Sequence, residues 1–253
     1  MFTKVKTQSE IAAMRESAKI LATVLDKLEQ TVDVGMNMLE IDEIASKEVK
    51  AMGATAPFLG YGDPAFPGSI CISVNDEVEH GVPRNIELND GDIVSLDFGV
   101  LYKGMISDSG RTLAVGDVSS KNLKLLETTK RALYAGIDEV RDGVKVGDIS
   151  AAVEKVLKKG GYGIIRDLVG HGVGHELHED PNIPNYGKAG RGPMLKAGMT
   201  ICIEPMAALG DWRIFMDDDN WTLRMSDGKN AAHFEHTLLI TNDGADILTE
   251  SLL

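Results

Sequence analysis

The stretch Leu88-Asn-Asp-Gly-Asp-Ile-Val-Ser-Leu-Asp97 recurs later in the chain as Leu195-Lys-Ala-Gly-Met-Thr-Ile-Cys-Ile-Glu204. Each copy begins in a turn that contains glycine, continues as a short apolar run, and ends on a carboxylate. The recurrence indicates an internal duplication, with halves at about residues 1–120 and 121–253. We therefore expect each half to contribute a buried strand that ends on an acidic residue.

The segments around these stretches repeat in the same order. Residues 11–30 and 129–140 both have helical apolar spacing, and each is followed by a turn and a second helix that ends at glycine. Next, His80-Gly-Val-Pro83 corresponds to His171-Gly-Val-Gly174. This order predicts two similar halves that pair about a pseudo-twofold axis.

Five scattered residues carry the chemistry, namely Asp97, Asp108, His171, Glu204 and Glu235. Each lies in an apolar run or a glycine-rich turn, where an unpaired charge would be costly to bury. Strand alternation turns Asp97 and Glu204 away from the packed apolar side, and pairing of the halves would bring Asp97 near Glu204 and Asp108 near Glu235. Four carboxylates and one neutral nitrogen carry too much negative charge for one Zn²⁺ and suit two divalent ions.

The ordered motifs resemble those of type I methionine aminopeptidases over essentially the whole chain. The motifs are Gly170-His-Gly-Val-Gly-His-Glu-Leu-His-Glu-Asp-Pro181, Thr200-Ile-Cys-Ile-Glu-Pro-Met206, Phe234-Glu-His-Thr237, and Ser95-Leu-Asp97 followed by Asp108. The resemblance implies the α+β pita-bread fold, a curved, antiparallel-rich sheet with helices on its outer face and internal pseudo-twofold symmetry. It also implies that Asp97 chelates one metal, that His171 and Glu204 bind the other, and that Asp108 and Glu235 bridge both.

The activity implied by the resemblance is hydrolysis of the first peptide bond, which removes an N-terminal methionine when the second residue is small. Glu204 would accept a proton from the attacking water and return it to the leaving amine. His178 would stabilise the negative charge that develops on the carbonyl oxygen. His80 would contact the nitrogen side of the scissile bond. The two divalent ions would be Co, Mn, Fe or Zn, because oxygen-rich ligation with one histidine accepts any of them.

The remaining histidines do not fit a separate metal motif. His175 follows His171 by four residues, but the glycines at 172 and 174 disfavour a helix that would bring the two together. We expect His175, His233 and His236 to support neighbouring groups or the structure.

An apolar pocket beside the metals is expected to bind the methionine side chain. Residues 58–71 resemble the substrate-pocket wall of the family, and Trp221 resembles its lid. A long, polarisable thioether suits aromatic and sulfur neighbours. The aromatic residues are also consistent with ordinary core positions. The expected pocket residues are Phe58, Tyr61, Phe66, Cys71, Leu177 and Trp221, together with His80 and His178.

Composition excludes several other classes of protein. Two cysteines do not imply a disulfide framework, and the net charge of −13 argues against nucleic acid as the main ligand. No apolar run reaches transmembrane length, and the polar first residues do not resemble a signal peptide. We therefore expect one catalytic metallopeptidase domain, residues 1–253, that acts as a cytoplasmic monomer without DNA or membrane partners. Its partners would be peptides and nascent chains that begin with methionine, with transient ribosome contact.

Two other functions remain open from the residues alone. An Xaa-Pro peptidase of the same fold would share the metal ligands, but such enzymes usually carry an extra N-terminal domain and a wider spacing between the two motif histidines. A non-catalytic binding protein of this fold would be expected to lack metal ligands, whereas this chain has all five.

Overall fold

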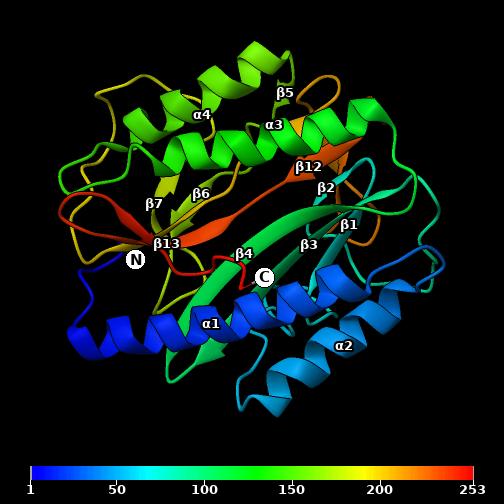
Figure 1. The fold of residues 1–253 in the computed structure, drawn as a ribbon, viewed down its shortest axis with the longest axis horizontal. Helices are drawn as coiled ribbons and strands as arrows, with labels where there is room; N and C mark the ends of the chain where they lie inside the picture. The colour runs from blue at the N-terminus through cyan, green and yellow to red at the C-terminus, as the bar shows by residue number, and fades with distance from the viewer. Residues whose placement is uncertain (1, 253) are drawn as a thin grey trace.

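The computed structural model describes residues 2–252, and its helices form two pairs. The first pair is α1 (Gln8–Thr31) and α2 (Met38–Ala51), and the second is α3 (Ser120–Ile137) and α4 (Val146–Gly160). In Figure 1, the two pairs lie on opposite sides of strands β4 (Met105–Ala114) and β13 (His236–Ile240), which run between them. The same order of helices therefore occurs in both halves of the chain.

The named strands pair in an antiparallel sense throughout. One sheet has the order β1-β3-β4 and another β14-β13-β8-β6-β7, and two smaller sheets have the orders β10-β11-β2 and β12-β9-β5. The remaining strands are β1 (Cys71–Val74), β2 (Glu77–Glu79), β3 (Ile93–Tyr102), β5 (Gly163–Ile164), β6 (Gly170–Gly172), β7 (Glu179–Ile183), β8 (Thr200–Ile203), β9 (Met206–Ala208), β10 (Ile214–Met216), β11 (Leu223–Met225), β12 (Ala231–His233) and β14 (Ala245–Ile247).

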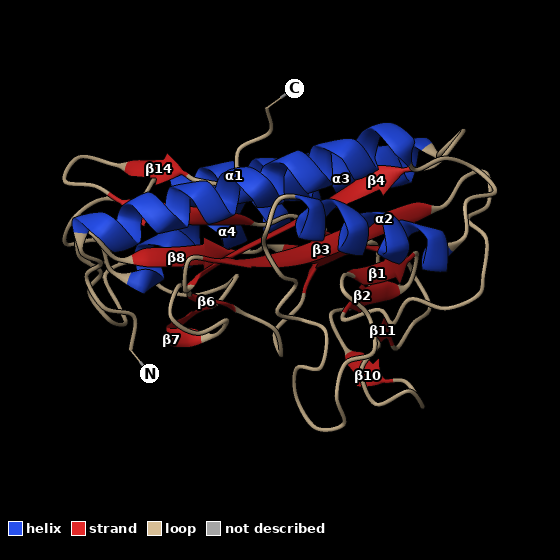
Figure 2. Ribbon diagram, turned by 90° about the horizontal axis from the view of Figure 1, so that it is seen from below, coloured by secondary structure: helices blue, strands red, loops and turns tan. Residues whose placement is uncertain are grey.

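The helices cover one face of the strands, and the long loops lie on the other face (Figure 2). Each helix pair packs on its own apolar cluster. Leu21, Leu25 and Leu28 of α1 pack in a cluster with Leu96 and Phe98 of β3, and all five side chains are fully buried. A second cluster joins α3 and α4 to β8 and β13. Burial of apolar area is the main driving force of folding, so these two clusters fix the helices against the strands. The face of the strands that points away from the helices is left for the loops.

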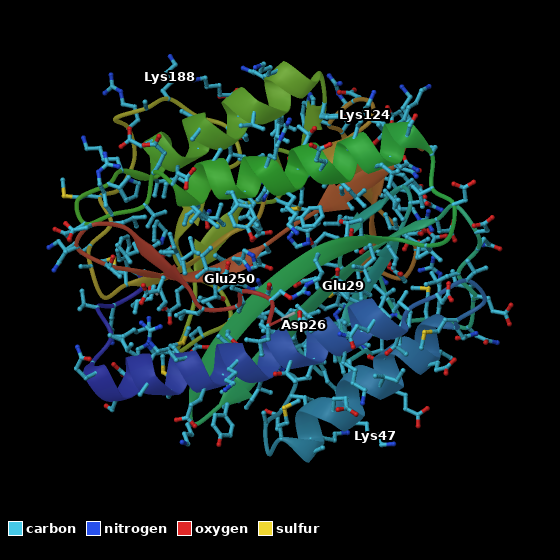
Figure 3. The ribbon with its side chains drawn as sticks, viewed as in Figure 1. Asp26, Glu29, Lys47, Lys124, Lys188 and Glu250 are labelled. Carbon is cyan, nitrogen blue, oxygen red and sulfur yellow. The ribbon has the colours of Figure 1, made fainter. Side chains whose placement is uncertain are left out.

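The start of α1 is set by a capping box. The backbone N–H of Glu10 donates to Thr7 Oγ1, and the backbone N–H of Thr7 donates to Glu10 Oε2. This reciprocal pair satisfies donors that the first helical turn leaves free. The other end of α1 holds the C-terminal segment, since Asp26 accepts from Arg111 Nη1 at 2.8 Å and from the backbone N–H of Leu252 at 2.7 Å. Glu29, which lies beside Asp26 in Figure 3, accepts from the same arginine at 2.7 Å.

Two threonines join the halves along a seam that we define as the contact of β4 with β12 and β13. Thr237 Oγ1 accepts from the backbone N–H of Asp108 at 2.9 Å and donates to its carbonyl oxygen at 2.7 Å. Thr112 Oγ1 does the same for His233, with both distances at 2.8 Å. The backbone N–H of Glu235 also donates to the carbonyl oxygen of Gly110 at 2.8 Å. Side-chain hydroxyls thus replace part of a regular strand ladder at the place where Asp108 and Glu235 meet.

Two predictions of element boundaries were wrong. Helix α3 begins at Ser120 rather than near 129, because Ser119 caps it by accepting from the backbone N–H of Asn122, and it ends at Ile137. Asp97 does not end its strand, since β3 continues to Tyr102 and pairs with β4 along its whole length. Glu204, in contrast, directly follows β8 as expected.

Across residues 2–252, none of the helices combines the length and the apolar character that crossing a lipid bilayer requires.

Replacing Thr237 by Val should weaken the seam. The variant keeps the side-chain volume but leaves the backbone N–H and C=O of Asp108 without their hydroxyl partner in a fully buried place. Its free energy of unfolding, measured by urea denaturation, should fall by about 2 kcal/mol. Thr23→Val, at an exposed position of α1, is the matched control and should change stability by less than about 0.5 kcal/mol. Equal losses in the two variants would mean that the seam is not stabilising.

Candidate metal centre

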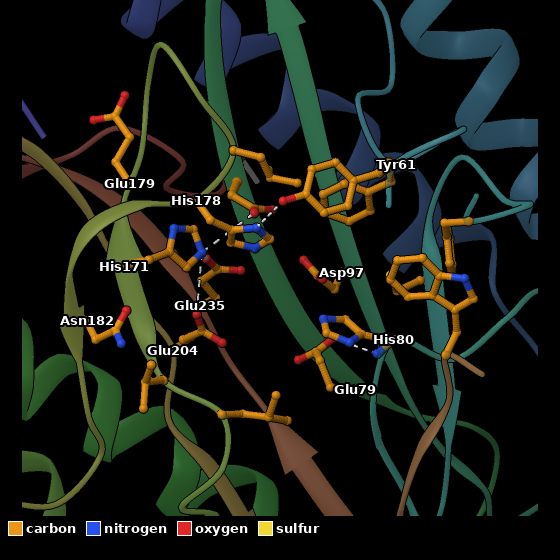
Figure 4. A pocket seen from close by; sticks show the side chains of 18 of the residues that line it. Tyr61, Glu79, His80, Asp97, His171, His178, Glu179, Asn182, Glu204 and Glu235 are labelled. Carbon is orange, nitrogen blue, oxygen red and sulfur yellow. Dashed lines mark hydrogen bonds and ion pairs between the residues drawn. The ribbon is translucent and has the colours of Figure 1, made fainter. Parts of the chain in front are cut away.

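One cavity with a volume of about 410 Å³ is lined by every residue that the sequence predicted for the site. Its wall includes residues of β2, β6 and β7, which lie on the side away from the helices in Figure 2. Figure 4 shows the predicted residues converging from both halves of the chain. The wall carries Phe58, Tyr61, Phe66, Cys71, His80, Asp97, Asp108, His171, Leu177, His178, Glu204, Trp221 and Glu235, and also Glu79.

The predicted ligands lie within reach of shared cations. His171 Nε2 is 3.5 Å from Glu204 Oε1, and 4.0 Å from both Asp108 Oδ2 and Glu235 Oε1. Carboxylate oxygens of Asp97, Asp108 and Glu235 lie within 4.8 Å of one another. Asp97 and Asp108 come from neighbouring strands of one sheet, whereas His171, Glu204 and Glu235 come from the other half.

A backbone contact prepares His171 to act as a ligand. Its Nδ1 lies 2.9 Å from the carbonyl oxygen of Gly172, which can only accept a hydrogen bond. The proton is therefore assigned to Nδ1, and Nε2 presents a lone pair to the carboxylates. Burial, together with the neighbouring His178, lowers the pKa of His171 to about 3, so the ring is neutral at physiological pH.

The carboxylates are held at high electrostatic cost. Burial raises the pKa values of Asp97, Asp108, Glu204 and Glu235 well above those of ordinary carboxyl groups, and the neighbouring acids raise them further. Asp97 Oδ1, Asp108 Oδ1 and Glu235 Oε1 are buried and have no hydrogen-bond partner among the described residues. Oxygen ligands with unused lone pairs, beside one imidazole nitrogen, fit divalent cations. The residues present therefore suit the metal that the sequence predicted.

Glu79 and His233 form a buried pair next to the predicted ligands, and no pattern in the sequence indicates this pair. His233 Nδ1 lies 2.9 Å from Glu79 Oε2, and its Nε2 lies 3.9 Å from Glu204 Oε2. Burial opposes both charges, but their mutual attraction lowers the pKa of Glu79 and raises that of His233. Gly110 makes room for this ring, since a Cβ there would lie 2.6 Å from His233 Cε1. The only sequence signal for Glu79 is its position next to His80.

His80 and His178 lie at the edge of the carboxylate cluster. The backbone N–H of His80 donates to Glu79 Oε1 at 3.2 Å, and its φ of 56° is unusual for a non-glycine residue. The ring of His178 packs edge-on against that of His171, with centroids 4.6 Å apart. Burial and the nearby His80 lower the pKa of His178 to about 4, so this ring is also neutral at physiological pH.

Apolar side chains form another part of the cavity wall, which also includes Asp167, Glu179, Asp180 and Asn182. The rings of Phe66 and Trp221 meet edge to face, with centroids 5.3 Å apart, and Trp221 Nε1 donates to the carbonyl oxygen of Pro64 at 3.1 Å. Phe58 packs against Gly99, where a Cβ would come within 2.8 Å of its ring. Burial raises the pKa of the Cys71 thiol well above its usual value, which does not suit a nucleophile. The cavity thus joins a charged cluster to an apolar wall.

Two other histidines lie outside the cavity wall. His175 Nε2 is 2.7 Å from Glu10 Oε1 of α1. His236 Nδ1 is 3.0 Å from Thr249 Oγ1, and its ring packs against Tyr134. Cys202 Sγ lies close enough to His171 and Glu235 to complete a possible ligand set, but burial raises the pKa of its thiol well above the usual value.

Comparisons with known proteins agree with this geometry. The sequence model of Metallopeptidase family M24 matches residues 12–242 of this chain. Methionine aminopeptidase 1 of Bacillus subtilis (strain 168) is 44% identical over 244 residues, which cover 96% of this chain and 98% of the relative. Methionine aminopeptidase of Aquifex aeolicus is 42% identical over 257 residues, covering 99% of this chain and all of the relative.

Solved structures confirm the expected pita-bread fold. The crystal structure of methionine aminopeptidase from Thermotoga maritima superposes with a TM-score of 0.96 at 39% identity, covering 99% of this chain and 100% of that one. The prolidase from Pyrococcus furiosus superposes with a TM-score of 0.78 at 25% identity, covering 98% of this chain but only 66% of that one. The Xaa-Pro alternative is therefore not favoured.

Replacing Asp108 by Asn should have opposite effects with and without metal. The pKa of the Asp108 carboxyl group is raised in the folded state. The free energy of folding that this group contributes is therefore fully present below the ordinary carboxyl pKa, and it is lost as the pH rises through the raised pKa. In chelator at pH 7.5, Asp108→Asn should therefore be more stable than the parent, and the difference should shrink toward pH 4. With added Mn²⁺, the variant should gain much less stability than the parent if the ion binds at the predicted ligands, because the anionic oxygen of Asp108 is lost.

The midpoint of thermal unfolding at each pH, with and without the ion, measures both effects. Asp117→Asn, on the exposed surface, is the control and should respond to Mn²⁺ as the parent does. A variant that is less stable than the parent in chelator at pH 7.5 would contradict the assigned electrostatic cost.

Proposed function

The chain belongs to metallopeptidase family M24, and we propose that it removes the N-terminal methionine from peptides and nascent proteins whose second residue is small. The observation that carries this proposal is the joining of the carboxylate cluster to an apolar wall inside one cavity of about 410 Å³. The carboxylate cluster would hold the metal ions that activate water for attack on a peptide bond, and the apolar wall suits a long apolar side chain next to that bond. Relatives with 40–44% identity carry the name methionine aminopeptidase, which supports the same activity.

The five predicted ligands would hold two divalent ions. Asp97 would chelate one ion, His171 and Glu204 would bind the other, and Asp108 and Glu235 would bridge them. When bound, such ions polarise a carbonyl group and make water a nucleophile at neutral pH. Co, Mn, Fe and Zn all suit this set of oxygen and imidazole donors.

The other side chains would handle the substrate and its protons. Glu204 would accept the proton of the attacking water and return it to the leaving amine. The neutral imidazole of His178 would donate a hydrogen bond to the carbonyl oxygen as negative charge develops on it. His80 would contact the nitrogen side of the scissile bond. Phe58, Phe66, Cys71, Leu177 and Trp221 would enclose the methionine side chain.

We also propose that residues 1–253 act as one catalytic domain and as a monomer in the cytoplasm. All of the proposed ligands and pocket residues come from a single chain, which supports a site that needs no second copy. Nascent chains would reach the cavity through transient contact with the ribosome. With a net charge of −13, that contact would use a local part of the folded surface.

The activity test uses the peptide Met-Ala-Ser and an Xaa-Pro peptide, each with Mn²⁺ or Co²⁺. We expect release of methionine from the first peptide, no cleavage of the second, and loss of activity in chelator. Cleavage of the Xaa-Pro peptide alone would overturn the proposed function. Metal binding without either activity would favour a binding protein.

Two substitutions test the proposed residue roles. Glu204→Gln should lower kcat by at least about a hundredfold, because the water loses its proton acceptor. His178→Ala should lower kcat by about a hundredfold while the variant still binds metal, because only the stabilisation of the carbonyl oxygen is lost. Glu43→Gln, at an exposed position of α2, is the control. If both site variants hydrolysed Met-Ala-Ser as fast as the control, the assigned mechanism would be wrong.

A further inference from the structure

One contact in the cavity joins the apolar wall directly to the proposed catalytic imidazole. The hydroxyl of Tyr61 lies 2.8 Å from His178 Nδ1, and the two rings meet edge to face with centroids 5.5 Å apart. Figure 4 draws this hydrogen bond as a dashed line between the two labelled side chains. A tyrosine that served only as an apolar wall would not need to place its hydroxyl on this nitrogen.

The direction of the hydrogen bond follows from what each partner can donate. A neutral imidazole carries one proton, on either Nδ1 or Nε2, so the partner of one nitrogen decides what the other can offer. Burial raises the pKa of Tyr61, so its phenol keeps its proton. Within residues 2–252 the Tyr61 hydroxyl has no hydrogen-bond partner other than His178. Donation to Nδ1 gives the phenol proton an acceptor within the protein, whereas in the reverse direction that proton goes to water, because Tyr61 is 41% exposed.

We propose that Tyr61 is a positioning residue that donates to His178 Nδ1 and so holds His178 in the tautomer with its proton on Nε2. That nitrogen is on the far side of the ring from Tyr61, and only this tautomer has an N–H to offer a substrate oxygen there. In the other tautomer Nε2 would carry a lone pair and would repel a carbonyl oxygen that gains negative charge. The inference rests on the proposed function, because the receiving oxygen is that of the scissile peptide bond.

The loop that carries Tyr61 is built to hold it still. The backbone N–H of Tyr61 donates to the carbonyl oxygen of Phe58 at 2.9 Å, and the carbonyl oxygen of Tyr61 accepts from the backbone N–H of Phe66 at 2.8 Å. Gly62 follows with a φ of 78°, and a Cβ there would lie 2.6 Å from the ring of Trp221. The backbone of Tyr61 is thus hydrogen-bonded to Phe58 and Phe66, two aromatic residues that would enclose the methionine side chain. The pocket wall and the orientation of the catalytic imidazole therefore depend on one loop.

Kinetics of Tyr61→Phe separate this role from that of a pocket wall. The variant keeps the aromatic ring and removes only the hydroxyl. We expect kcat for Met-Ala-Ser to fall about tenfold with little change in KM, as is typical for loss of one hydrogen bond that matters in the transition state. In the His178→Ala background, the same substitution should have no further effect, because the group that it orients is absent. Equal effects in both backgrounds, or a rise in KM alone, would overturn the inference.

The tautomer itself can be observed by ¹⁵N NMR of the imidazoles in Zn²⁺-loaded protein. His178→Ala identifies the signals, and we expect the proton of His178 on Nε2 in the parent and a mixture of tautomers in Tyr61→Phe. Tyr186→Phe makes the same chemical change outside the cavity and should leave both the tautomer and kcat unchanged. A proton on Nδ1 in the parent would overturn the inference whatever the substrate. Because this measurement needs no turnover, a failure to cleave methionyl peptides would count against the proposed function and not against the tautomer.

Discussion

The seam between β4 and strands β12 and β13 is the contact on which the rest of the site depends. Thr237 and Thr112 each bind a backbone N–H and a backbone C=O across it, at distances of 2.7 to 2.9 Å. These bonds hold Asp108 and Glu235 together, although both are buried carboxylates that repel each other. The apolar clusters under the two helix pairs give each half its stability, but the seam fixes how the halves meet. A hydroxyl can satisfy both backbone groups where the strands approach without a regular ladder, which explains why threonine occupies both positions.

The electrostatic strain of the site is what makes it useful. Burial raises the pKa values of four carboxyl groups, and several of their oxygens have no hydrogen-bond partner among residues 2–252. Divalent ions would reduce the repulsion between these buried acids. The free energy that folding spends to bring the acids together would therefore increase the affinity of the folded protein for the ions. Glu79 and His233 belong to the same balance. The imidazole of His233 lies between the carboxylates of Glu79 and Glu204, at 2.9 Å and 3.9 Å. The buried negative charge of Glu79 is therefore accompanied by a positive charge on His233.

Much of the fold and the site could be predicted from the chain because the relevant signals are local or repeated. The apolar spacing of the helices and the recurrence of Leu88–Asp97 as Leu195–Glu204 are both properties of short segments. The proposed metal ligands were predicted from charged residues in apolar runs and glycine-rich turns. Prediction failed where long-range pairing decides the outcome. Asp97 lies within β3 because pairing with β4 carries the strand on to Tyr102, and no pattern near Asp97 reports that partner.

By itself, the sequence determined which residues are acidic or basic in apolar surroundings, which segments have helical apolar spacing, and that one pattern occurs twice. These features predicted the ligand types, and the resemblance of the ordered motifs to a known family implied the class of fold. Only the tertiary structure decided that Glu79 faces His233, that Gly110 makes room for the imidazole ring, and that Tyr61 reaches His178 Nδ1. Each of these contacts joins residues far apart in the chain, through side chains whose individual types are common. Such pairs carry no spacing signal, because their distances are set by the packing of whole elements and not by the local preferences of either residue.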